Sequence, residues 1–294
     1  MEPKITNVTV GKYQFKITDN TLIFRDEIYS RNFKIGGKKD DCVNISITYK
    51  DNNPIYASIP YAMYDTECAL NVNLEQGSGT ILMIKTLLKH IKKELPSINV
   101  VHFEDKSNIE CATNEEIEKK KSRTMKRGTH IYPIPLYYFS IAFNGETWYE
   151  KHFNATQKDP SKHQKYKEKI ELLLSSPDYK TNLSFIDFCR LASPPVELLE
   201  ELESYYNNSN TIGNFFKSIP KKDRCRLVRD WLGRFMHSEF KDVFSNIDWI
   251  MPIPNREDSL TGGKKRKTKK YYCPKGKISY YQTYKNFGVN SEDI

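Results

Sequence analysis

The chain has 294 residues and a mass of 34.5 kDa, and 38% of its residues are apolar, 13% aromatic and 28% charged. This composition can form a sizeable core, and it excludes a disordered protein, a collagen and a disulfide-rich miniprotein. No stretch reaches the roughly 18 apolar residues of a membrane span, and the first ten residues lack the apolar core of a signal peptide. We therefore expect an intracellular protein that is not secreted and has no membrane span.

The formal net charge is +9, but the charge is unevenly distributed. Residues 261–277 contain eight basic residues and no acidic residue, so the rest of the chain is nearly neutral. A nucleic-acid-binding fold usually spreads positive charge over one folded face. We expect a basic and aromatic tail over residues 261–294, in which the stretch from Lys264 to Lys277 contacts nucleic acid or an acidic partner weakly. A merely solubilising end is the other interpretation.

Six cysteines are spread along the chain and are never closer than 26 residues. There is no C-x-x-C motif and no paired-histidine spacing, so we expect no metal site. Separated thiols in a chain without a signal peptide predict reduced, mostly buried cysteines.

The first 75 residues predict β-structure. Short strands are expected over residues 8–10, 13–17 and 22–24. A hairpin is expected over residues 43–49 and 55–59, around the turn residues 51–54. Residues 70–75 (LNVNLE) alternate apolar and polar side chains, which predicts a half-buried strand.

A glycine loop and a helix follow this alternating segment. Ile81, Ile84, Leu87, Leu88, Ile91 and Leu95 recur at helical spacing, and Pro96 ends the helix. Residues 98–103 predict a further strand. Strand, loop, helix and strand within about 35 residues predict a crossover unit with two parallel strands.

The second half of the chain predicts helices. Residues 108–132 form a charged insertion, and residues 136–153 fit either a helix or a hairpin turning at Asn144-Gly145; we favour the helix. Helical periodicity then continues over residues 161–175, 183–192, 194–207, 211–219 and 221–245. We expect an α/β domain over residues 1–160, a helical domain over 161–260 and the tail over 261–294.

The loop of residues 76–80 (QGSGT) is the strongest candidate for a binding site. Two glycines let a backbone approach a ligand closely, and unpaired amides at a helix start favour an anion. This pattern predicts a phosphate or pyrophosphate site, although it lacks the Gly-Lys-Ser/Thr ending of a P-loop. A tight strand-to-helix turn without a ligand is the alternative.

Two motifs together resemble the GCN5-related N-acetyltransferases. The loop Gln76-Gly77-Ser78-Gly79-Thr80-Ile81 is similar to the family's acetyl-CoA pyrophosphate loop, and Trp148-Tyr149-Glu150-Lys151-His152-Phe153 is similar to its later helix motif. The order of elements matches over residues 42–155. The resemblance implies an α+β fold with a mixed sheet and a crossover helix, followed in this chain by the all-helical domain.

The resemblance also implies roles for individual residues. Acetyl-CoA would bind at Gln76, Gly77, Ser78, Gly79 and Thr80, with its pantetheine arm along the backbone of Val72. Tyr149 would protonate the leaving thiolate, and Glu75 or Glu67 would act as the base toward a small-molecule or protein amine. Packing is the alternative role of Tyr149.

Two departures favour a different class of function. Ile81 is bulky where the family has a small residue, and His152 replaces the glycine before Phe153. The alternative is a noncatalytic structural or interaction protein that reuses the fold. The tail resembles those of proteins from large double-stranded DNA viruses, which would place the protein in the host cytoplasm or the virion.

A weaker candidate lies at the end of the strand over residues 98–103. His102, Glu104 and Asp105 could support acid–base chemistry there. A purely structural histidine is the more common alternative.

Overall fold

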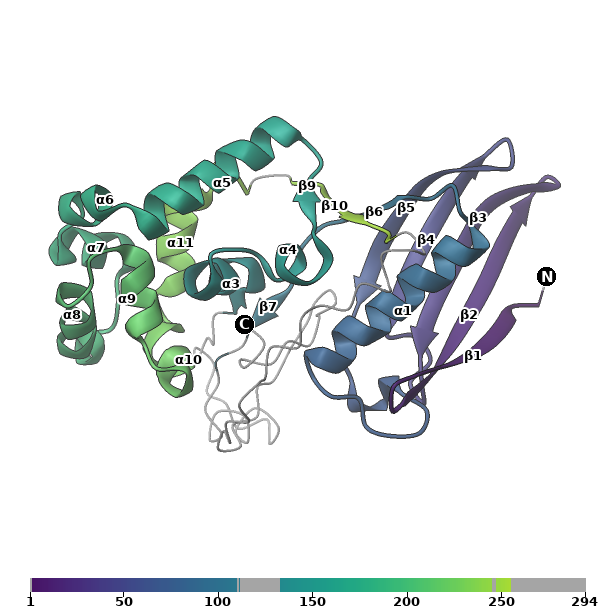
Figure 1. Ribbon diagram of the computed structural model, residues 1–294, viewed down its shortest axis with the longest axis horizontal. Coiled ribbons are helices and arrows are strands. Elements are labelled where there is room, and N and C mark those ends of the chain that lie inside the picture. The colour runs from purple at the N-terminus through teal and green to yellow at the C-terminus, as the bar shows by residue number, and fades with distance from the viewer. Residues whose placement is uncertain (1, 110, 112–132, 245–246, 255–294) are drawn as a thin grey trace, which may run out of the picture.

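A computed structural model of the chain describes residues 2–109, 111, 133–244 and 247–254. Figure 1 shows two parts, a large sheet with one helix across it and a group of shorter helices. Most of the charged insertion and the whole basic tail lie outside the described residues. The expected α/β class with a mixed sheet is confirmed, while its GCN5-related character stays a prediction.

The main sheet has the strand order β1-β2-β3-β4-β5-β6-β10-β9. Strands β1 to β5 pair antiparallel in succession, β5 pairs parallel with β6, and β10 pairs antiparallel with both β6 and β9. The bounds are β1 (Lys4–Val10), β2 (Tyr13–Phe24), β3 (Glu27–Gly36), β4 (Val43–Lys50), β5 (Asn53–Ala62), β6 (Val100–Phe103), β9 (Thr156–Gln157) and β10 (Trp249–Pro252). A separate pair joins β7 (Asn108–Ile109) to β8 (Ile134–Pro135).

The core of this part lies between the sheet and helix α1 (Ser78–Glu94). Alternate strand residues such as Phe15, Phe33 and Ile45 are fully buried, as the period of two requires. The apolar residues of α1 expected from helical spacing pack on the same core, and Ile84, Leu87 and Ile91 are fully buried. The helix is therefore confirmed.

The strand expected over residues 70–75 is wrong. The strand before the helix is β5, which pairs parallel with β6 at Ser58 and His102. Residues 63–77 instead form an irregular connection that contains a 3-10 turn, η1 (Thr66–Cys68). Within it, Leu74 is buried whereas Val72 is 41% exposed, so the alternation reflects one anchored leucine and not a sheet face.

The expectation of reduced cysteines is also wrong. Cys42 at the start of β4 is paired with Cys68 in η1, and Cys111 is paired with Cys225 in the helical part. Cys189 is the free cysteine of the described residues. The sequence did not indicate either pair, because the two cysteines are separated by 26 positions in one pair and by 114 positions in the other. The intracellular location stays a prediction, and paired cysteines remove one of its arguments.

The helical part begins before the expected boundary near Pro160. Its elements are α3 (Leu136–Asn144), α4 (Trp148–Phe153), α5 (Pro160–Ser175), α6 (Pro177–Asn182), α7 (Phe185–Ala192), η2 (Val196–Leu198), α8 (Leu199–Asn207), α9 (Ile212–Ser218), η3 (Lys221–Asp223), α10 (Arg224–Val228) and α11 (Leu232–Phe240). The helices expected from periodicity are present. The last one, expected over residues 221–245, is interrupted between Val228 and Leu232.

Residues 136–153 form helices and not a hairpin. Gly145 ends α3 with a φ of 80°, the left-handed conformation that glycine adopts readily at this position. Helix α4 then starts with a capping box, in which the Thr147 hydroxyl accepts from the Glu150 amide and the Glu150 carboxylate accepts from the Thr147 amide. The Asn-Gly signal marks a helix break here.

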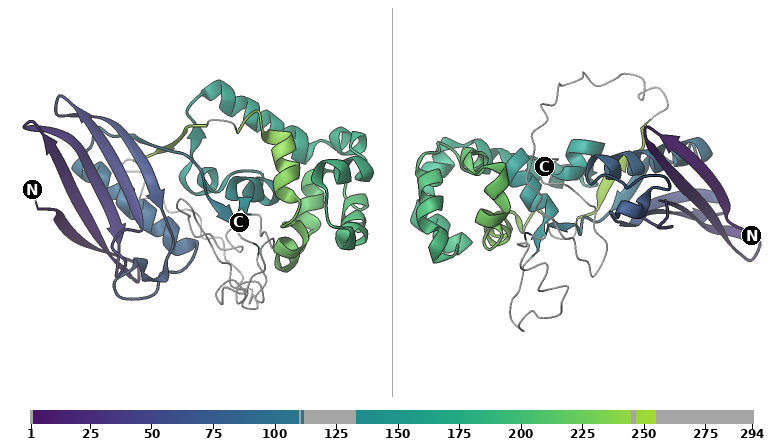
Figure 2. Two further views of the ribbon diagram at one scale, coloured as in Figure 1. Left: turned by 180° about the vertical axis from the view of Figure 1, so that it is seen from behind. Right: turned by 90° about the horizontal axis from the view of Figure 1, so that it is seen from below.

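The two parts are connected by more than one crossing of the chain. Strand β10 follows the helices in sequence but lies in the sheet between β6 and β9, so residues 161–260 are not purely helical. The two views in Figure 2 show β10 reaching from the helices to the sheet. Helix α3 also contacts α9 and α11. These connections bring Asp105, Tyr137 and Trp249 together, with Tyr149 next to them.

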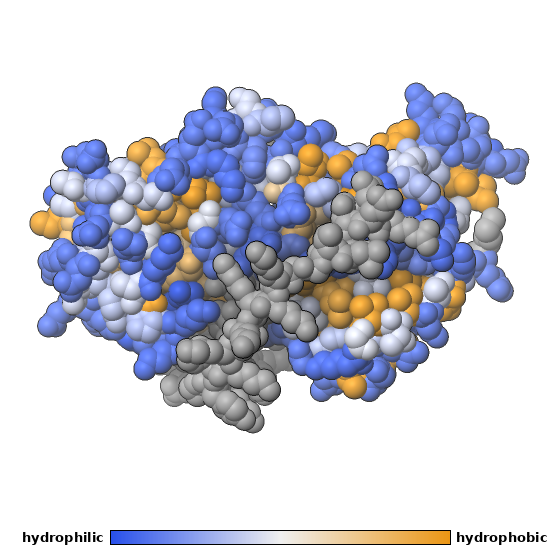
Figure 3. Space-filling view, in the orientation of Figure 1, coloured by the Kyte–Doolittle hydropathy of each residue, from blue (hydrophilic) through white to orange (hydrophobic). Residues whose placement is uncertain are grey.

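Hydrophilic side chains cover most of the face drawn in Figure 3, with hydrophobic residues gathered in smaller areas. No helix within the described ranges is long and apolar enough to cross a membrane.

Candidate active site at the end of strand β6

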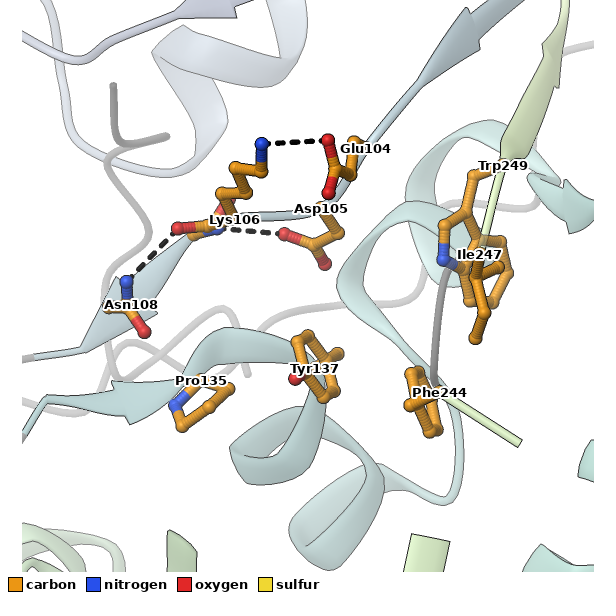
Figure 4. A pocket seen from close by; sticks show the side chains of 10 residues that line it. Glu104, Asp105, Lys106, Asn108, Pro135, Tyr137, Phe244, Ile247 and Trp249 are labelled. Carbon is orange, nitrogen blue, oxygen red and sulfur yellow. Dashed lines mark hydrogen bonds and ion pairs between the residues drawn. The ribbon is translucent and has the colours of Figure 1, made fainter. Parts of the chain in front are cut away.

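A cavity of about 330 Å³ lies where β6 ends, between the start of α3 and the approach to β10 (Figure 4). This volume is at the small end of the range for ligand sites. Its described lining consists of Glu104, Asp105, Lys106, Ser107, Asn108, Pro135, Tyr137, Phe244, Ile247 and Trp249.

Asp105 is the chemically distinctive residue of this cavity. Its Oδ1 accepts a hydrogen bond from the Ser107 amide at 3.0 Å, whereas its Oδ2 is buried and has no hydrogen-bond partner. Figure 4 shows the carboxyl group facing the space in front of Tyr137 and Phe244. Burial raises the pKa of Asp105 to about 7, although hydrogen bonding from Ser107 opposes the shift. A carboxyl group with this pKa can take up or release a proton at neutral pH.

The predicted proton donor, Tyr149, lies directly behind the cavity wall. Its hydroxyl is 3.1 Å from the Ser107 hydroxyl, and its ring is fully buried against Phe103 and Trp148. Burial and then the nearby Asp105 charge raise the pKa of Tyr149 well above its usual value. Tyr149 therefore stays protonated at neutral pH and meets the cavity through Ser107.

Helix α4 is held in place by a buried carboxylate, which fixes Tyr149. Glu150 closes the capping box and also accepts hydrogen bonds from the Tyr166 hydroxyl and from the Lys167 ammonium, the latter at 2.8 Å. These bonds join α4 to α5. They explain why a helix of only six residues positions a tyrosine firmly.

His102, the more prominent member of the weaker candidate group, has a different role. Its Nδ1 lies 3.0 Å from Asp248, which also pairs with Lys158 at 3.2 Å. The ring packs against Tyr56 with centroids 4.5 Å apart. Because neighbouring residues on a strand point to opposite faces, His102 lies across the sheet from Phe103. His102 therefore links β6 to the residue before β10 through Asp248. Of the three residues His102, Glu104 and Asp105, it is Asp105 that supplies the carboxyl group of the cavity.

The predicted pyrophosphate loop is arranged differently from a ready anion site. Gly77 precedes α1 with a φ of 73° and offers no side chain to cap the helix. The carboxylate of Glu75 accepts a hydrogen bond from the Ser78 hydroxyl at 3.3 Å and pairs with Lys12. Lys12 lowers the pKa of Glu75, which keeps the group ionised. The carboxylate of Glu75, paired with Lys12, thus lies beside the helix start where the pyrophosphate was expected.

Gly79 is explained by packing within the protein. A Cβ at this position would lie 2.8 Å from Cγ and 2.9 Å from Cδ1 of Leu74. The glycine is therefore needed for the approach of Leu74 and not, on this arrangement, for that of a ligand. Thr80, next to it, is completely buried. In the arrangement seen, packing within the protein accounts for Gly79 and Thr80.

The structure does not group the other predicted site residues with Tyr149. Glu67 is exposed in η1, where its amide donates to the Asp65 side chain. Val72 is exposed outside any strand, so no strand backbone is available there for a pantetheine arm. Glu75 and residues 76–80 lie at the start of α1. These positions form one group, and Asp105, Ser107 and Tyr149 form another.

Sequence reasoning missed most of the residues that surround Asp105. Ser107 carries no motif, and Tyr137, Phe244 and Trp249 come from segments more than 100 residues apart. The only available signal was the acidic end of the strand at Glu104 and Asp105. Within the described ranges, no group of three or more histidine, cysteine or acidic side chains is arranged to hold a metal ion.

Comparison with known proteins finds no matching family model, no similar curated protein and no similar solved structure. The case for function therefore rests on the site itself.

Proposed function

We propose that the cavity at the end of β6 is the reaction site of an enzyme acting on a small molecule, and that Asp105 exchanges a proton with the substrate. The supporting observation is the Asp105 carboxyl group in the cavity lining, whose Oδ2 is closed to solvent and has no hydrogen-bond partner. Buried polar atoms are nearly always hydrogen-bonded, and functional sites supply many of the exceptions. A substrate bound in the cavity would meet the Asp105 carboxyl group.

The reaction we propose is acyl transfer to an amine, as the resemblance to the N-acetyltransferases implies. What supports this choice is the chain order of β5, α1, the parallel strand β6 and, after β7, β8 and α3, the helix α4 with its tyrosine. In this reaction Asp105, and not Glu67 or Glu75, takes the proton from the incoming ammonium group. Tyr149 holds the Ser107 hydroxyl and can supply a proton through it to the departing group.

The acyl donor that the resemblance implies is acetyl-CoA. The Glu75 carboxylate and the packing of Leu74 on Gly79 both oppose a pyrophosphate at residues 76–80. Calorimetric titration with acetyl-CoA and CoA tests the donor directly. Absence of binding at millimolar coenzyme would remove this donor and leave the role of Asp105 to be judged separately.

The decisive experiment compares turnover of the wild type with that of Asp105→Asn. A panel of small amines is incubated with acetyl-CoA, and the released thiol is measured. Loss of a general base typically lowers kcat about 10²-fold or more, so we expect at least that decrease. Asp178→Asn is the matched control, since Asp178 is exposed in α6. If the wild type turns over and Asp105→Asn turns over equally fast, the proton-transfer role is refuted.

The second candidate is the noncatalytic interaction protein, which the ionised Glu75 at the start of α1 favours. In this case the basic tail, which lies outside the described residues, would contact nucleic acid or an acidic partner. Deleting residues 261–294 should then abolish salt-sensitive binding to a polyanion. The deletion should leave the cavity intact, because its described lining ends at Trp249.

A further inference from the structure

The walls of the cavity differ in chemistry. Asp105, Lys106 and Asn108 lie on one side, whereas Tyr137, Phe244 and Trp249 lie on the other. Figure 4 shows this division, with the charged and polar groups on the strand side and the rings facing them. Tyr137 and Phe244 are stacked, with centroids 4.6 Å apart and planes 11° from parallel. The ring side is therefore a rigid apolar surface opposite a carboxyl group.

Asp105 is the charged group of the described lining that has no ionic partner. Glu104 and Lys106 pair with each other at 2.7 Å, and their side chains are 65% and 60% exposed at the rim. They compensate one another and are well solvated. When Asp105 is ionised, it thus gives the interior of the cavity a single negative charge. A buried charge without a partner is strongly unfavourable, and a bound cation would neutralise it.

From these observations we infer that the ligand of this cavity is a small amphipathic organic cation, an ammonium group attached to a short apolar body. The ammonium pairs with the Asp105 carboxylate, and the body lies against Tyr137, Phe244 and Trp249. This inference rests on the proposed function, because it takes the cavity to be the substrate site, and it selects a free small amine over an amine carried by a protein.

The same arrangement disfavours other ligand classes. An anion would meet the Asp105 carboxylate without a free cation from the described lining to compensate it. A neutral alcohol could bond to the Asp105 carboxylate but would leave the charge unneutralised. A cation without an apolar body would leave the rings of Tyr137, Phe244 and Trp249 exposed to water and would gain no free energy from burying them.

Binding of such a cation should depend on pH in a defined direction. Binding requires ionised Asp105, whose pKa in the empty cavity is about 7, so affinity should rise between pH 5.5 and 8. Among the residues that the structure describes, the other titratable groups near Asp105 are Glu104, Lys106, Tyr137 and Tyr149. The pKa of Tyr137 is raised to about 12 and that of Tyr149 is raised well above its usual value, so neither ionises in this range.

Four probes of related shape test the inference: phenethylamine, 2-phenylethanol, phenylacetate and ethylamine. The full chain is labelled with ¹⁵N in its tryptophans, and indole signals are followed during titration. Trp249 lines the cavity, whereas Trp231 is buried among the helices and serves as an internal reference. Phenethylamine should shift the Trp249 signal and bind at least 10-fold more tightly than each of the other three probes.

Asp105→Asn should reduce phenethylamine affinity at least 10-fold at pH 8 and abolish its rise with pH, while Asp178→Asn should change neither. Equal affinity for phenethylamine and 2-phenylethanol, tighter binding of phenylacetate, or no shift with any probe would overturn the inference. If phenethylamine binds through Asp105 but is never turned over, the inference stands and the proposed enzyme fails. If turnover depends on Asp105 but 2-phenylethanol binds as tightly as phenethylamine, the proposed enzyme stands and the inference of a cationic ligand fails.

Discussion

The hydroxyl groups of Ser107 and Tyr149 lie 3.1 Å apart, although 42 residues separate them in the sequence. Ser107 follows β6 and lines the cavity, whereas Tyr149 belongs to α4 and is completely buried. The Ser107 amide also donates to Asp105 at 3.0 Å. One serine thus connects the buried tyrosine with the carboxyl group, which relates the resemblance-based role of Tyr149 to a site that has its own geometry.

Tyr149→Phe should lower kcat about 10-fold or more and leave amine affinity nearly unchanged, because the substitution removes the hydroxyl behind Ser107 but not the cavity wall. Stability should fall by about 1 kcal/mol for the lost hydrogen bond. Tyr206→Phe is a matched control, since Tyr206 is equally buried and donates to the Leu183 carbonyl among the helices. Steady-state kinetics and denaturant unfolding measure both effects. If both variants retain full turnover, Tyr149 serves packing alone.

Asp105 should make the folded protein less stable as the pH rises. Its folded pKa of about 7 exceeds the ordinary value of 3.8, so the folded state retains a proton that the unfolded chain releases. Stability from this group is complete below pH 3.8 and is lost as the pH approaches 7, by at most roughly 4 kcal/mol. The side chain of Asp105→Asn cannot titrate, so the variant does not lose this stability. The unfolding free energy of Asp105→Asn minus that of the wild type should therefore increase between pH 4 and 7.

Urea unfolding of the wild type, Asp105→Asn and Asp178→Asn at several pH values measures this difference. Asp178→Asn should follow the wild type throughout. A constant offset between the wild type and Asp105→Asn would show that Asp105 has an ordinary pKa in the folded protein, and its proposed role as a base at neutral pH would be lost.

Local patterns predicted the helices better than they predicted the strands or the site. Helix α1 follows from apolar residues at helical spacing, and its buried face is the predicted one. The alternation of residues 70–75 misled because Leu74 is anchored under Gly79 and Cys68 is covalently held, which no short-range pattern reports. An alternating hexapeptide forms a strand only if neighbouring strands pair with it.

The site was only partly predictable, for a topological reason. Tyr149 and the acidic strand end at Asp105 were both noticed, but nothing local connects them. Their proximity depends on β7 and α3 turning the chain back, and on the four-residue strand β10 entering the sheet after the helices. Trp249 and Phe244 reach the cavity only through that return.

The two disulfides should contribute substantially to stability. The loop-entropy estimate is roughly 3.5 kcal/mol for the Cys42–Cys68 pair and roughly 5 kcal/mol for the Cys111–Cys225 pair, which closes the longer loop. Replacing both cysteines of a pair with serine should lower the unfolding free energy, and the decrease should be larger for Cys111–Cys225 than for Cys42–Cys68. Peptide mapping without reductant should recover both linked peptides. Full alkylation of Cys42, Cys68, Cys111 and Cys225 in the unreduced, unfolded protein would contradict the pairing.

The role of Gly79 separates packing from coenzyme binding. Gly79→Ala places a methyl group 2.8 Å from Leu74, so it should destabilise the free protein by about 1–3 kcal/mol. Leu74→Ala alone should destabilise through the cavity it leaves, and the double variant should be more stable than the two separate losses predict. Thermal or urea unfolding of the four proteins completes this cycle.

The same variants, together with Glu75→Gln, decide whether residues 76–80 bind a pyrophosphate. If they do, Glu75→Gln should tighten CoA binding several-fold, because it removes a negative charge beside the start of α1. Gly79→Ala combined with Leu74→Ala should then still bind CoA poorly despite its recovered stability. If instead CoA binds to none of these proteins while phenethylamine binds to all of them, residues 76–80 are a structural turn. The cavity at Asp105 would then be the site on which any enzymatic function has to rest.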